Sequence, residues 1–285
     1  MSCIRFDKRN NSRYCDIIMS VLFFDIDNTL LSHRTFSIPE SALTALKTAK
    51  ENGHLLFLCS GRSAEGLKEY YDPDLFDGVV ASSGANGVFH QKQVFHHTLA
   101  REDIEDVIAL SEEYKIGMFL QCLPGSYMNR YGYERLVRIF KNRENVFKSL
   151  GERRLLDTFP REPAIKMDIF FTRETPVHEV LARIPEGLEV VSLLNPDRND
   201  YGSELTVKGI TKGSGILEMM EVLGKDSKDS YGFGDSENDL SMMKASGIGV
   251  AMGNAEPSVK EAADYITKDI EEDGIFHAMK HFELI

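Results

Sequence analysis

The sequence predicts an α/β protein, with a Rossmann-like parallel-sheet core and an inserted α+β domain. Short runs of four or five apolar residues alternate with helical patterns before residue 84 and again after residue 203. Such runs are typical of strands that are buried on both faces, and their alternation with helices predicts a parallel sheet with right-handed crossovers. Between these two stretches, hairpin and helix patterns are mixed, which indicates a separate unit.

Composition is that of a soluble globular protein and excludes several classes of partner. The 285 residues are 42% hydrophobic and 27% charged, which suffices for one large domain or two ordinary ones. The formal net charge is −12, so we do not expect nucleic acid as a partner. No apolar run approaches the roughly 20 residues that span a bilayer, so no membrane is expected either. The four cysteines lack metal-binding spacing, and we expect a reduced, cytoplasmic protein.

The first third of the chain has the pattern β-α-β-α-β. Residues 21–24 predict the first strand, and an apolar stripe that ends before Gly53 predicts the helix after it. Residues 55–59 predict the second strand, followed by a helix through Leu67, and residues 78–81 predict the third strand. This order places three parallel strands next to one another in the core.

The middle of the chain, residues 84–203, is expected to be the inserted domain. It begins in a small, glycine-rich segment at 82–87 that suits a hinge, and a hairpin is expected near 88–95. An insert that lies over the strand ends suits a lid on a site. Further helices and strands are expected at 104–108, 118–122, 131–141, 165–171, 177–182 and 188–194.

The last third returns to the core pattern, and the first 18 residues stand apart. The tail has four basic side chains and no sustained apolar segment, so it is not a signal peptide, and we expect it to be disordered and dispensable. The expected domains are therefore the tail at 1–18, the core at 19–83 and 204–285, and the insert at 84–203. In the last third, helices are expected at 212–223, 240–245, 259–263 and 274–282, and strands at 231–234, 249–252 and 265–267.

Two acids come directly after the first strand. Asp25 and Asp27 are two residues apart, so both side chains can point to one side of the strand end, where ligands bind in open α/β sheets. Two close carboxylates disfavour each other's ionisation, so the pair needs a cation or a shared proton. One carboxylate can attack phosphorus while the other transfers a proton. From this stretch alone, a turn stabilised by Asp and Asn28 is the alternative.

Two further segments can hold an anion. Ser60 and Gly61 follow the second strand, where a hydroxyl and backbone N–H groups form an anion cradle. A serine cap with a tight turn is the alternative. Lys212 lies at a helix N-terminus, where a cation opposes the helix dipole and is favoured only if it faces an anion. An ordinary exposed lysine is the alternative there.

The fourth segment is acidic and follows a strand of the last third. Asp235, Asn238 and Asp239 offer the oxygen ligands that Mg²⁺ prefers, although an acidic helix cap is the alternative. Taken together, the four segments supply a nucleophile, a hydroxyl, a lysine and metal-binding acids. This is the set of groups that phosphoryl transfer requires.

With these motifs the chain resembles the haloacid dehalogenase superfamily of phosphatases, in its Cof-type branch with a type IIB cap. The likeness covers residues 19–285, and the insert matches by position and length. One departure is Asn28, where the family usually has glycine, and Asn tolerates the left-handed backbone better than most residues. The matching segments are 25–30, 60–62, 212–213 and 234–239, with further likeness at 251–255 and 263–267.

The resemblance implies a Mg²⁺-dependent phosphatase that hydrolyses small phosphorylated metabolites through an aspartyl-phosphate. Sugar phosphates, nucleotides and pyridoxal phosphate are the implied substrate types. Asp25 would be the nucleophile and Asp27 the general acid and base. The implied phosphate ligands are Ser60, Gly61, Lys212 and Asn238, and the implied metal ligands are Asp25, Asp27 through its backbone carbonyl, Asp235 and Asp239.

Two other functions remain as alternatives. A phosphomutase of the phosphomannomutase type has a similar architecture, and it would form an isomer rather than free phosphate. A non-catalytic sensor of a phosphorylated ligand is disfavoured by the acid pair, because binding alone needs no nucleophile. We expect a small-molecule substrate and a monomer or weak homodimer. The eight histidines show no spacing typical of metal ligands.

Overall fold

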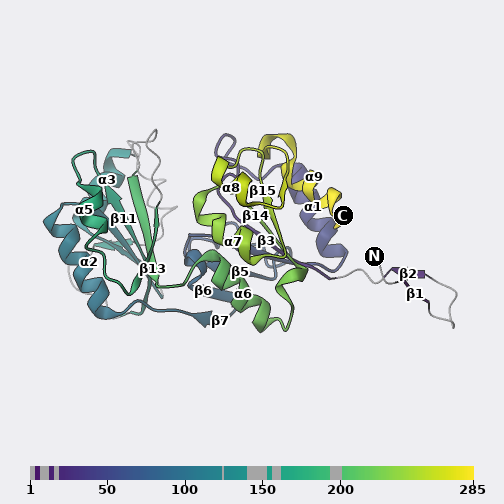
Figure 1. Ribbon diagram of the computed structural model, residues 1–285, viewed down its shortest axis with the longest axis horizontal. Coiled ribbons are helices and arrows are strands. Elements are labelled where there is room, and N and C mark those ends of the chain that lie inside the picture. The colour runs from purple at the N-terminus through teal and green to yellow at the C-terminus, as the bar shows by residue number, and fades with distance from the viewer. Residues whose placement is uncertain are drawn as a thin grey trace.

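Two sheets organise the chain, and they lie side by side in Figure 1. The structure is a computed structural model, and it describes residues 4–6, 13–15, 19–123, 125–139, 153–155, 162–192 and 201–285. Among the described residues, no helix combines the length and apolar character needed to cross a bilayer.

The core is an eight-stranded sheet drawn from both ends of the chain. Its strands are β3 (Val21–Phe24), β4 (Leu55–Cys59), β5 (Gly78–Ala81), β6 (Asn86–Phe89), β7 (Lys92–His96), β14 (Ser230–Gly234), β15 (Ile248–Ala251) and β16 (Tyr265–Ile266). The order is β16-β15-β14-β3-β4-β5-β6-β7. All neighbours pair in parallel except β5–β6 and β6–β7. The predicted α/β fold is confirmed.

The central strand β3 is buried on both faces. All four of its residues are fully buried, as the apolar run predicts. Phe24 stacks on Phe233 of β14 with ring centroids 4.6 Å apart, and Phe23 lies 5.3 Å from Phe57 of β4. The core helices are α1 (Glu40–Glu51), α6 (Lys212–Val222), α7 (Leu240–Ala245), α8 (Pro257–Ala262) and α9 (Gly274–His281). Figure 1 shows α1 and α9 on one side of the sheet and α6 and α7 on the other.

The expected start of the insert needs a correction. The hairpin β6–β7 pairs onto β5 and extends the core sheet, so it does not belong to the insert. Its sequence pattern predicts a hairpin correctly, but the pattern carries no information on which sheet edge the hairpin pairs with. The chain leaves the core after His96, through residues 97–100, rather than at the glycine-rich segment. It returns through residues 208–211.

The expected helix through Leu67 is also wrong. Residues 64–70 form consecutive turns. Ala64, Leu67 and Tyr70 pack on the core at helical spacing, but Gly66 lies within this stretch and Pro73 follows closely. A stretch this short, with a glycine inside it, does not sustain a regular helix although it packs on the core.

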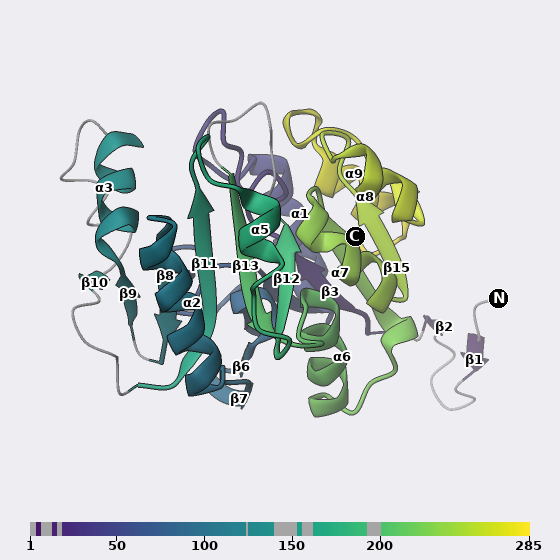
Figure 2. The ribbon, with the colours of Figure 1, turned by 60° about the vertical axis from the view of Figure 1, so that its left-hand side comes forward.

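The second sheet has six strands and is largely antiparallel. Its strands are β8 (Gly117–Cys122), β9 (Ser126–Met128), β10 (Arg153–Leu155), β11 (Ala164–Phe171), β12 (Leu188–Ser192) and β13 (Tyr201–Val207), in the order β10-β9-β8-β11-β13-β12. Its helices are α2 (Arg101–Glu113), α3 (Arg130–Ile139) and α5 (Val177–Leu181). Figure 2 shows α2 and α5 covering one face. Buried side chains such as Val107, Met167 and Val180 fill the space between them and the sheet.

Strand β13 is not among the strands expected from the sequence, and neither are β9 and β10. Only turn residues were recognisable around position 201, yet β13 pairs with β11 on one side and β12 on the other. Its residues alternate between polar Glu204 and Thr206 and apolar Leu205 and Val207, which is the short period-two pattern of a strand with one apolar face and contains no continuous apolar run. Residues 193–200, which the turn prediction also covers, lie outside the described part of the chain.

Within the N-terminal tail the structure describes two short strands. β1 (Ile4–Phe6) and β2 (Arg13–Cys15) pair antiparallel, apart from both sheets. These strands depart from the disordered tail that was expected. The other residues of the tail lie outside the described ranges.

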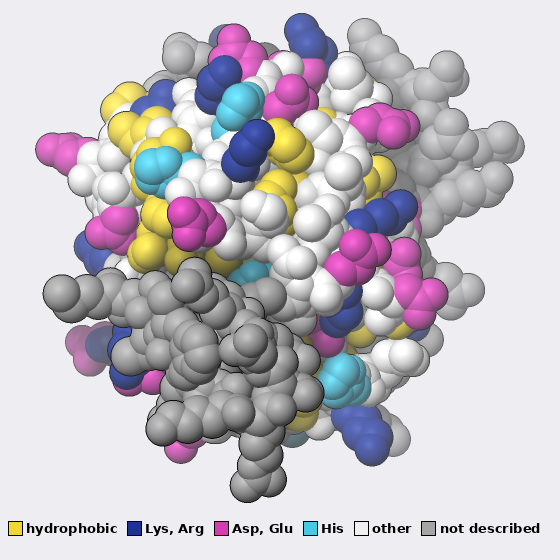
Figure 3. Space-filling view, turned by 90° about the vertical axis from the view of Figure 1, so that its right-hand side faces the viewer, with side chains coloured by type: hydrophobic (Ala, Val, Ile, Leu, Met, Phe, Trp, Pro, Cys, Tyr) yellow, Lys and Arg dark blue, Asp and Glu magenta, His cyan; other side chains and the backbone are white. Residues whose placement is uncertain are grey.

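The negative net charge does not gather on the face that carries α9. Figure 3 shows this face, and acidic, basic and hydrophobic side chains are interspersed over its described part. A strongly acidic chain therefore presents a mixed surface there. Three of the predicted site acids, Asp25, Asp235 and Asp239, are instead buried.

Candidate active site

The four predicted segments meet at the carboxyl ends of neighbouring strands. β3 lies between β14 and β4, so Asp25, Asp235 and Ser60 follow three adjacent strands. The Asp25 N–H donates to Phe233 O at 2.9 Å, which continues the pairing of β3 with β14 by one residue. Lys212 is the first residue of α6 and points into the same region. The parallel topology thus gathers residues that are far apart in the sequence.

Lys212 joins the first and fourth segments. Its Nζ lies 2.7 Å from Asp25 Oδ1, 2.6 Å from Asp239 Oδ1 and 3.1 Å from Asn238 Oδ1. The lysine side chain is 1% exposed. Burial alone would lower the pKa of Lys212, but Asp239 and Asp25 raise it well above its usual value. Lys212 is therefore a permanent buried cation, not the exposed lysine that was the alternative.

The acids outnumber this cation. Asp25, Asp235 and Asp239 each bring a carboxylate oxygen within 4.8 Å of the others. Burial raises the pKa of Asp25 to about 7 against the opposing effect of Lys212. Burial, with Asp25 and Asp239, raises the pKa of Asp235 to about 9, although Thr29 donates to its Oδ1 at 3.3 Å. The cluster therefore lacks positive charge, and its oxygens fit a divalent cation.

Asp239 differs from the other two acids because its oxygens are already engaged. Its Oδ1 accepts from Lys212, and its Oδ2 accepts the backbone N–H groups of Asp235 and Ser236 at 2.9 and 3.1 Å. A Cβ at Gly234 would lie 2.5 Å from the Asp239 carboxyl carbon, so only glycine fits at that strand end. Asp239 thus positions the loop and Lys212, while Asp25 and Asp235 are the carboxylates best placed for a metal.

Asp27 points away from this cluster. Arg62 binds it with two hydrogen bonds, Nε to Oδ2 at 2.9 Å and Nη2 to Oδ1 at 2.7 Å, and His33 Nε2 lies 2.8 Å from Oδ1. Burial alone would raise the pKa of Asp27, but Arg62 and then His33 lower it below its usual value. The side chain is thus a carboxylate, and only its backbone carbonyl is left as a candidate metal ligand.

Ser60 and Gly61 form the loop after β4. Ser60 is buried, and its Oγ accepts the N–H of Arg62 at 3.2 Å. Gly61 has no room for a side chain, because a Cβ there would lie 2.7 Å from Glu204 Oε1. The Gly61 carbonyl accepts from Lys166 Nζ at 2.9 Å. The second sheet therefore contacts this loop directly.

Asn28 adopts the left-handed backbone, with φ of 61°. Its N–H donates to Leu31 O at 2.8 Å, and its carbonyl accepts from Asn254 Nδ2 at 2.8 Å. The departure from the family's glycine is thus accommodated, because Asn tolerates this conformation. Asn254 also ties the segment 251–255 to the turn that follows Asp27.

Several contacts could not be foreseen from the motifs. His33 and Arg62 both contact Asp27, and no spacing of histidines indicates this role. Lys166 and Asp168 did carry a signal, because two charged residues at period two interrupt an otherwise apolar strand. Charged residues on a buried strand are rare unless they are paired, and this pattern points to a polar face.

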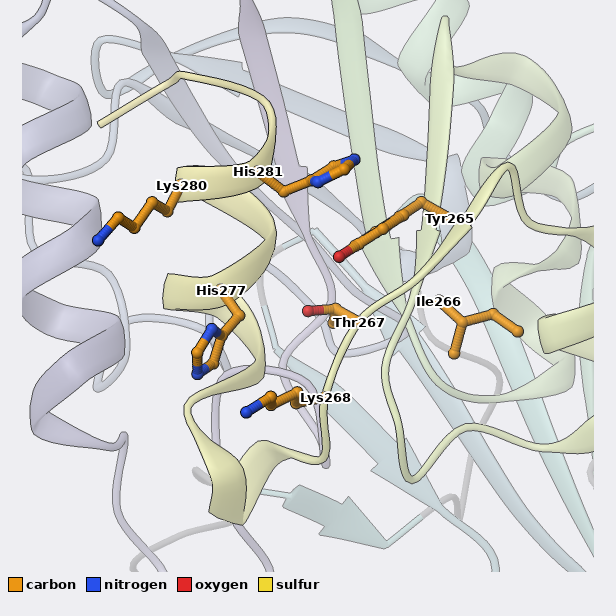
Figure 4. A pocket seen from close by; sticks show the side chains of 7 residues that line it. All are labelled: Tyr265, Ile266, Thr267, Lys268, His277, Lys280 and His281. Carbon is orange, nitrogen blue, oxygen red and sulfur yellow. The ribbon is translucent and has the colours of Figure 1, made fainter.

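A surface pocket lies elsewhere in the core. Figure 4 shows it between α9 and the segment that begins at β16. It contains none of the predicted site residues. Its lining residues are Tyr265, Ile266, Thr267, Lys268, His277, Lys280 and His281.

Comparisons with known proteins agree with this geometry. A family model of haloacid dehalogenase-like hydrolases matches residues 22–279. The solved structure of a subclass IIB sugar phosphatase of the haloacid dehalogenase superfamily is 32% identical, with a TM-score of 0.80, and the match covers 93% of this chain and 100% of the other.

Curated relatives from Bacillus subtilis match over nearly their whole length. Phosphatase YwpJ is 26% identical over 295 residues, 92% of this chain and 99% of the relative. The 5-amino-6-(5-phospho-D-ribitylamino)uracil phosphatase YitU is 25% identical over 269 residues, 92% of this chain and 97% of the relative. Both names describe removal of a phosphoryl group.

Proposed function

The chain belongs to the haloacid dehalogenase-like hydrolase family as a phosphatase, and we propose that it uses Mg²⁺ to hydrolyse small phosphorylated metabolites through an aspartyl-phosphate. Asp25 is the proposed nucleophile and Asp27 the proposed general acid and base. The rest of the proposal follows from the charges and hydrogen bonds around these two residues.

The observation that carries the proposal is the charge imbalance around Asp25. Three carboxylates surround one ammonium group, and burial raises the pKa of both Asp25 and Asp235. In this proposal, Mg²⁺ is held by the carboxylates of Asp25 and Asp235 and by the backbone carbonyl of Asp27. When bound, the ion neutralises charge on the phosphoryl oxygens. Lys212, Ser60 and the Gly61 loop then bind the remaining phosphoryl oxygens, with Asn238 beside Lys212.

The first step forms the bond from Asp25 to phosphorus and breaks the bond to the leaving oxygen. Asp25 Oδ1 is held by Lys212, and no hydrogen bond engages its other carboxylate oxygen among the described residues. That free oxygen is suited to in-line attack. Asp27 gives its proton to the leaving oxygen, so the alcohol departs neutral.

The second step breaks the aspartyl-phosphate. Water attacks phosphorus, its proton passes to Asp27, and Asp25 is regenerated with release of inorganic phosphate. Arg62 and His33 hold Asp27 as a carboxylate, which is the form that this step needs. For the first step the carboxyl group must be protonated, so Asp27 must leave Arg62 when substrate binds.

The second sheet supports the expected size of substrate. It contacts the Gly61 loop through Lys166 and approaches it closely through Glu204, and a site covered in this way favours a small leaving group over a polymer. One similar structure is of a sugar phosphatase, and YitU acts on a phosphoribitylamino pyrimidine. We therefore retain sugar phosphates, nucleotides and pyridoxal phosphate as the candidate substrates. A cytoplasmic location and a monomer or weak homodimer remain part of the proposal.

A metabolite screen with Mg²⁺ tests the proposal, with free phosphate as the readout. Asp25→Asn should abolish phosphate release, by at least about 10⁴-fold, while the melting temperature is kept or raised. Removal of Mg²⁺ with a chelator should stop turnover, and added Mg²⁺ should restore it. Full turnover in Asp25→Asn would end the proposal. Formation of an isomer without free phosphate would instead identify a phosphomutase.

A further inference from the structure

The second sheet presents a polar face to the core, and this face carries charged residues that the reaction described above does not use. Lys166, Asp168, Glu204 and Gln121 come from three adjacent strands, β11, β13 and β8. The Lys166 side chain is 2% exposed and the Glu204 side chain 8%. Buried charges of this kind add little stability compared with apolar residues of similar size. A structural role alone therefore explains them poorly.

Lys166 joins this face to the phosphate loop. Its Nζ lies 2.8 Å from Glu204 Oε1, 3.0 Å from Asp168 Oδ1 and 2.9 Å from the carbonyl oxygen of Gly61. An ammonium group has three donors, and these three acceptors use all of them. Lys166 is thus a fully engaged cation whose third partner belongs to the core rather than to its own sheet.

The two acids explain why Lys166 is held so firmly. Asp168 and Glu204 are directly opposite each other on β11 and β13, an arrangement that is unfavourable for like charges. Lys166 lies between them, and Gln121 donates to Asp168 Oδ2 at 3.1 Å while Ser83 donates to Glu204. The ammonium group therefore has little freedom to move away from Gly61.

The peptide that Lys166 contacts also contacts Ser60. The carbonyl of Gly61 and the N–H of Arg62 belong to the same peptide group and point in opposite directions. The carbonyl accepts from Lys166, and the N–H donates to Ser60 Oγ at 3.2 Å. The peptide plane is thus fixed from both ends, and a charged donor on the carbonyl strengthens the N–H on the other side.

This arrangement fixes the Ser60 hydroxyl as an acceptor toward Arg62 and leaves its hydrogen free to donate. One lone pair of Oγ is occupied by the Arg62 N–H, and the Ser60 hydroxyl hydrogen has no acceptor among the residues that the structure describes. A serine hydroxyl has one donor and two acceptor positions. The free donor is therefore available for an oxygen of the transferred phosphoryl group.

We propose that Lys166 is a positioning residue for phosphate binding, acting from the second sheet through the Gly61–Arg62 peptide to orient the Ser60 hydroxyl. Lys166 does not touch the substrate in this proposal. The inference rests on the proposed function, because it assigns Ser60 to the phosphoryl group. It adds a link between the insert and the chemistry of the core.

The test removes the lysine without changing the net charge of the cluster. Lys166→Met/Glu204→Gln loses one positive and one negative charge, and Glu204→Gln alone is its reference. Binding of inorganic phosphate in the presence of Mg²⁺ is measured by calorimetry, which needs no turnover. We expect the dissociation constant to rise about tenfold in the double variant relative to its reference, the effect of losing one charged hydrogen bond. Lys208→Met, which replaces an exposed lysine directly after β13, should bind like the wild type.

A double-mutant cycle with Ser60→Ala separates this role from a merely structural one. If Lys166 acts through the Ser60 hydroxyl, its removal in the Ser60→Ala background should change phosphate affinity by less than about twofold. The same tenfold loss in that background would overturn the proposal, because Lys166 would then act independently of Ser60. Unchanged affinity in Lys166→Met/Glu204→Gln would overturn it as well.

A second variant keeps the test decisive if the double variant does not fold. Lys166→Arg retains a charged donor near Gly61, so it should keep phosphate affinity within about threefold of the wild type. A tenfold loss in a folded Lys166→Arg protein would contradict the proposal. If the wild type binds phosphate but hydrolyses nothing, the proposed function fails while the positioning role is still tested by binding.

Discussion

The two sheets each bury one lysine among acids, and the two clusters behave differently. In the core, Lys212 faces Asp25 and Asp239, with Asp235 close by. In the second sheet, Lys166 faces Asp168 and Glu204. The first cluster has an excess of two carboxylates and the second an excess of one. That difference in charge balance separates a candidate metal site from a positioning cluster.

The hydrogen bonds around the acids reinforce this contrast. In the second sheet, Gln121 and Ser83 donate to the acids. Burial still raises the pKa of Asp168, but Lys166 with Ser83 lowers the pKa of Glu204 although burial alone would raise it. In the core, burial raises the pKa of Asp235 to about 9, because few donors compensate for it. The core thus has two acids with a raised pKa beside one lysine, and the second sheet has one, so the core has the stronger need for an external cation.

The largest effect on activity in these tests is expected from Asp235→Asn in the core cluster. The substitution removes one of the two excess charges and one candidate metal ligand, so kcat/KM should fall about 10²- to 10³-fold. The metal-free protein should be stabilised by about 1 kcal/mol, because a buried carboxyl is replaced by a neutral amide. Thermal melts with and without Mg²⁺ check this. Mg²⁺ should raise the melting temperature of the wild type but not that of Asp235→Asn. A variant that keeps both activity and this rise would exclude Asp235 as a ligand.

The pH dependence of stability should test the charge imbalance of the core cluster next. For a carboxyl whose pKa is raised in the folded state, the folded protein holds its proton longer than the unfolded chain, so stability falls as pH rises between the two values. The pKa of Asp25 is about 7 and that of Asp235 about 9. Without metal, the free energy of unfolding should therefore fall from about pH 4 to pH 9, by up to about 1.4 kcal/mol per pH unit for each proton.

Urea unfolding at several pH values measures this effect. Mg²⁺ should flatten the slope, because the ion replaces the protons on Asp25 and Asp235. Asp235→Asn should also reduce the slope above pH 7, where Asp235 is the group still titrating. A metal-free wild type whose stability rises over this range would contradict the charge imbalance assigned to the core cluster.

A smaller effect is expected where the two clusters meet. Gly61→Ala would place a Cβ 2.7 Å from Glu204 Oε1, so the loop or the acid must shift. We expect a loss of about tenfold in kcat/KM, mainly through KM, because phosphate binding is disturbed more than the nucleophile. Gly53→Ala is the matched control, since a Cβ there meets nothing within 4 Å, although its φ of 89° costs some stability. An effect on stability alone would show that the loop does not bind phosphate.

The smallest effect should follow from His33→Gln. His33 is a partner of Asp27, but Arg62 still binds both oxygens of that carboxylate when His33 is replaced. Activity should change by less than about threefold, with a small shift in its acid limb, since one of the groups that lower the pKa of Asp27 is lost. A pH–rate profile measures this. A loss comparable to that of Asp235→Asn would make His33 part of the catalytic machinery.

The local features of the sequence predict much of the core and its site. The apolar run at 21–24 and the acids after it fall where expected, because burial on both faces and the strand-end position are encoded by neighbouring residues. Asn28 in the left-handed region was anticipated for the same reason. Lys212 could be placed at a helix start, and the structure adds that it faces acids rather than solvent.

The remaining features depend on which distant residues meet. The hairpin β6–β7 could have paired with either sheet, and β13 lacks an apolar run because one of its faces is polar. The partners of Asp27 come from a loop and from the end of β4, and no local spacing identifies them. Lys166 is the clearest example of a contact that the local sequence does not determine. Its charge within an apolar strand was visible in the sequence, but its contact with Gly61 depends on how the two sheets pack.

The two crossings between the sheets have a consequence for protein engineering. The chain passes through residues 97–100 and 208–211, so these segments are the natural cut points for exchanging the insert between relatives. A transplanted insert would bring its own residues to the positions of Lys166 and Glu204, while the recipient keeps Gly61 and Ser83. Chimeras should therefore inherit leaving-group preference from the donor only when these four positions are matched. The contacts between the insert and the core are specific to each protein, so the residues on both sides of the junction have to be transferred together.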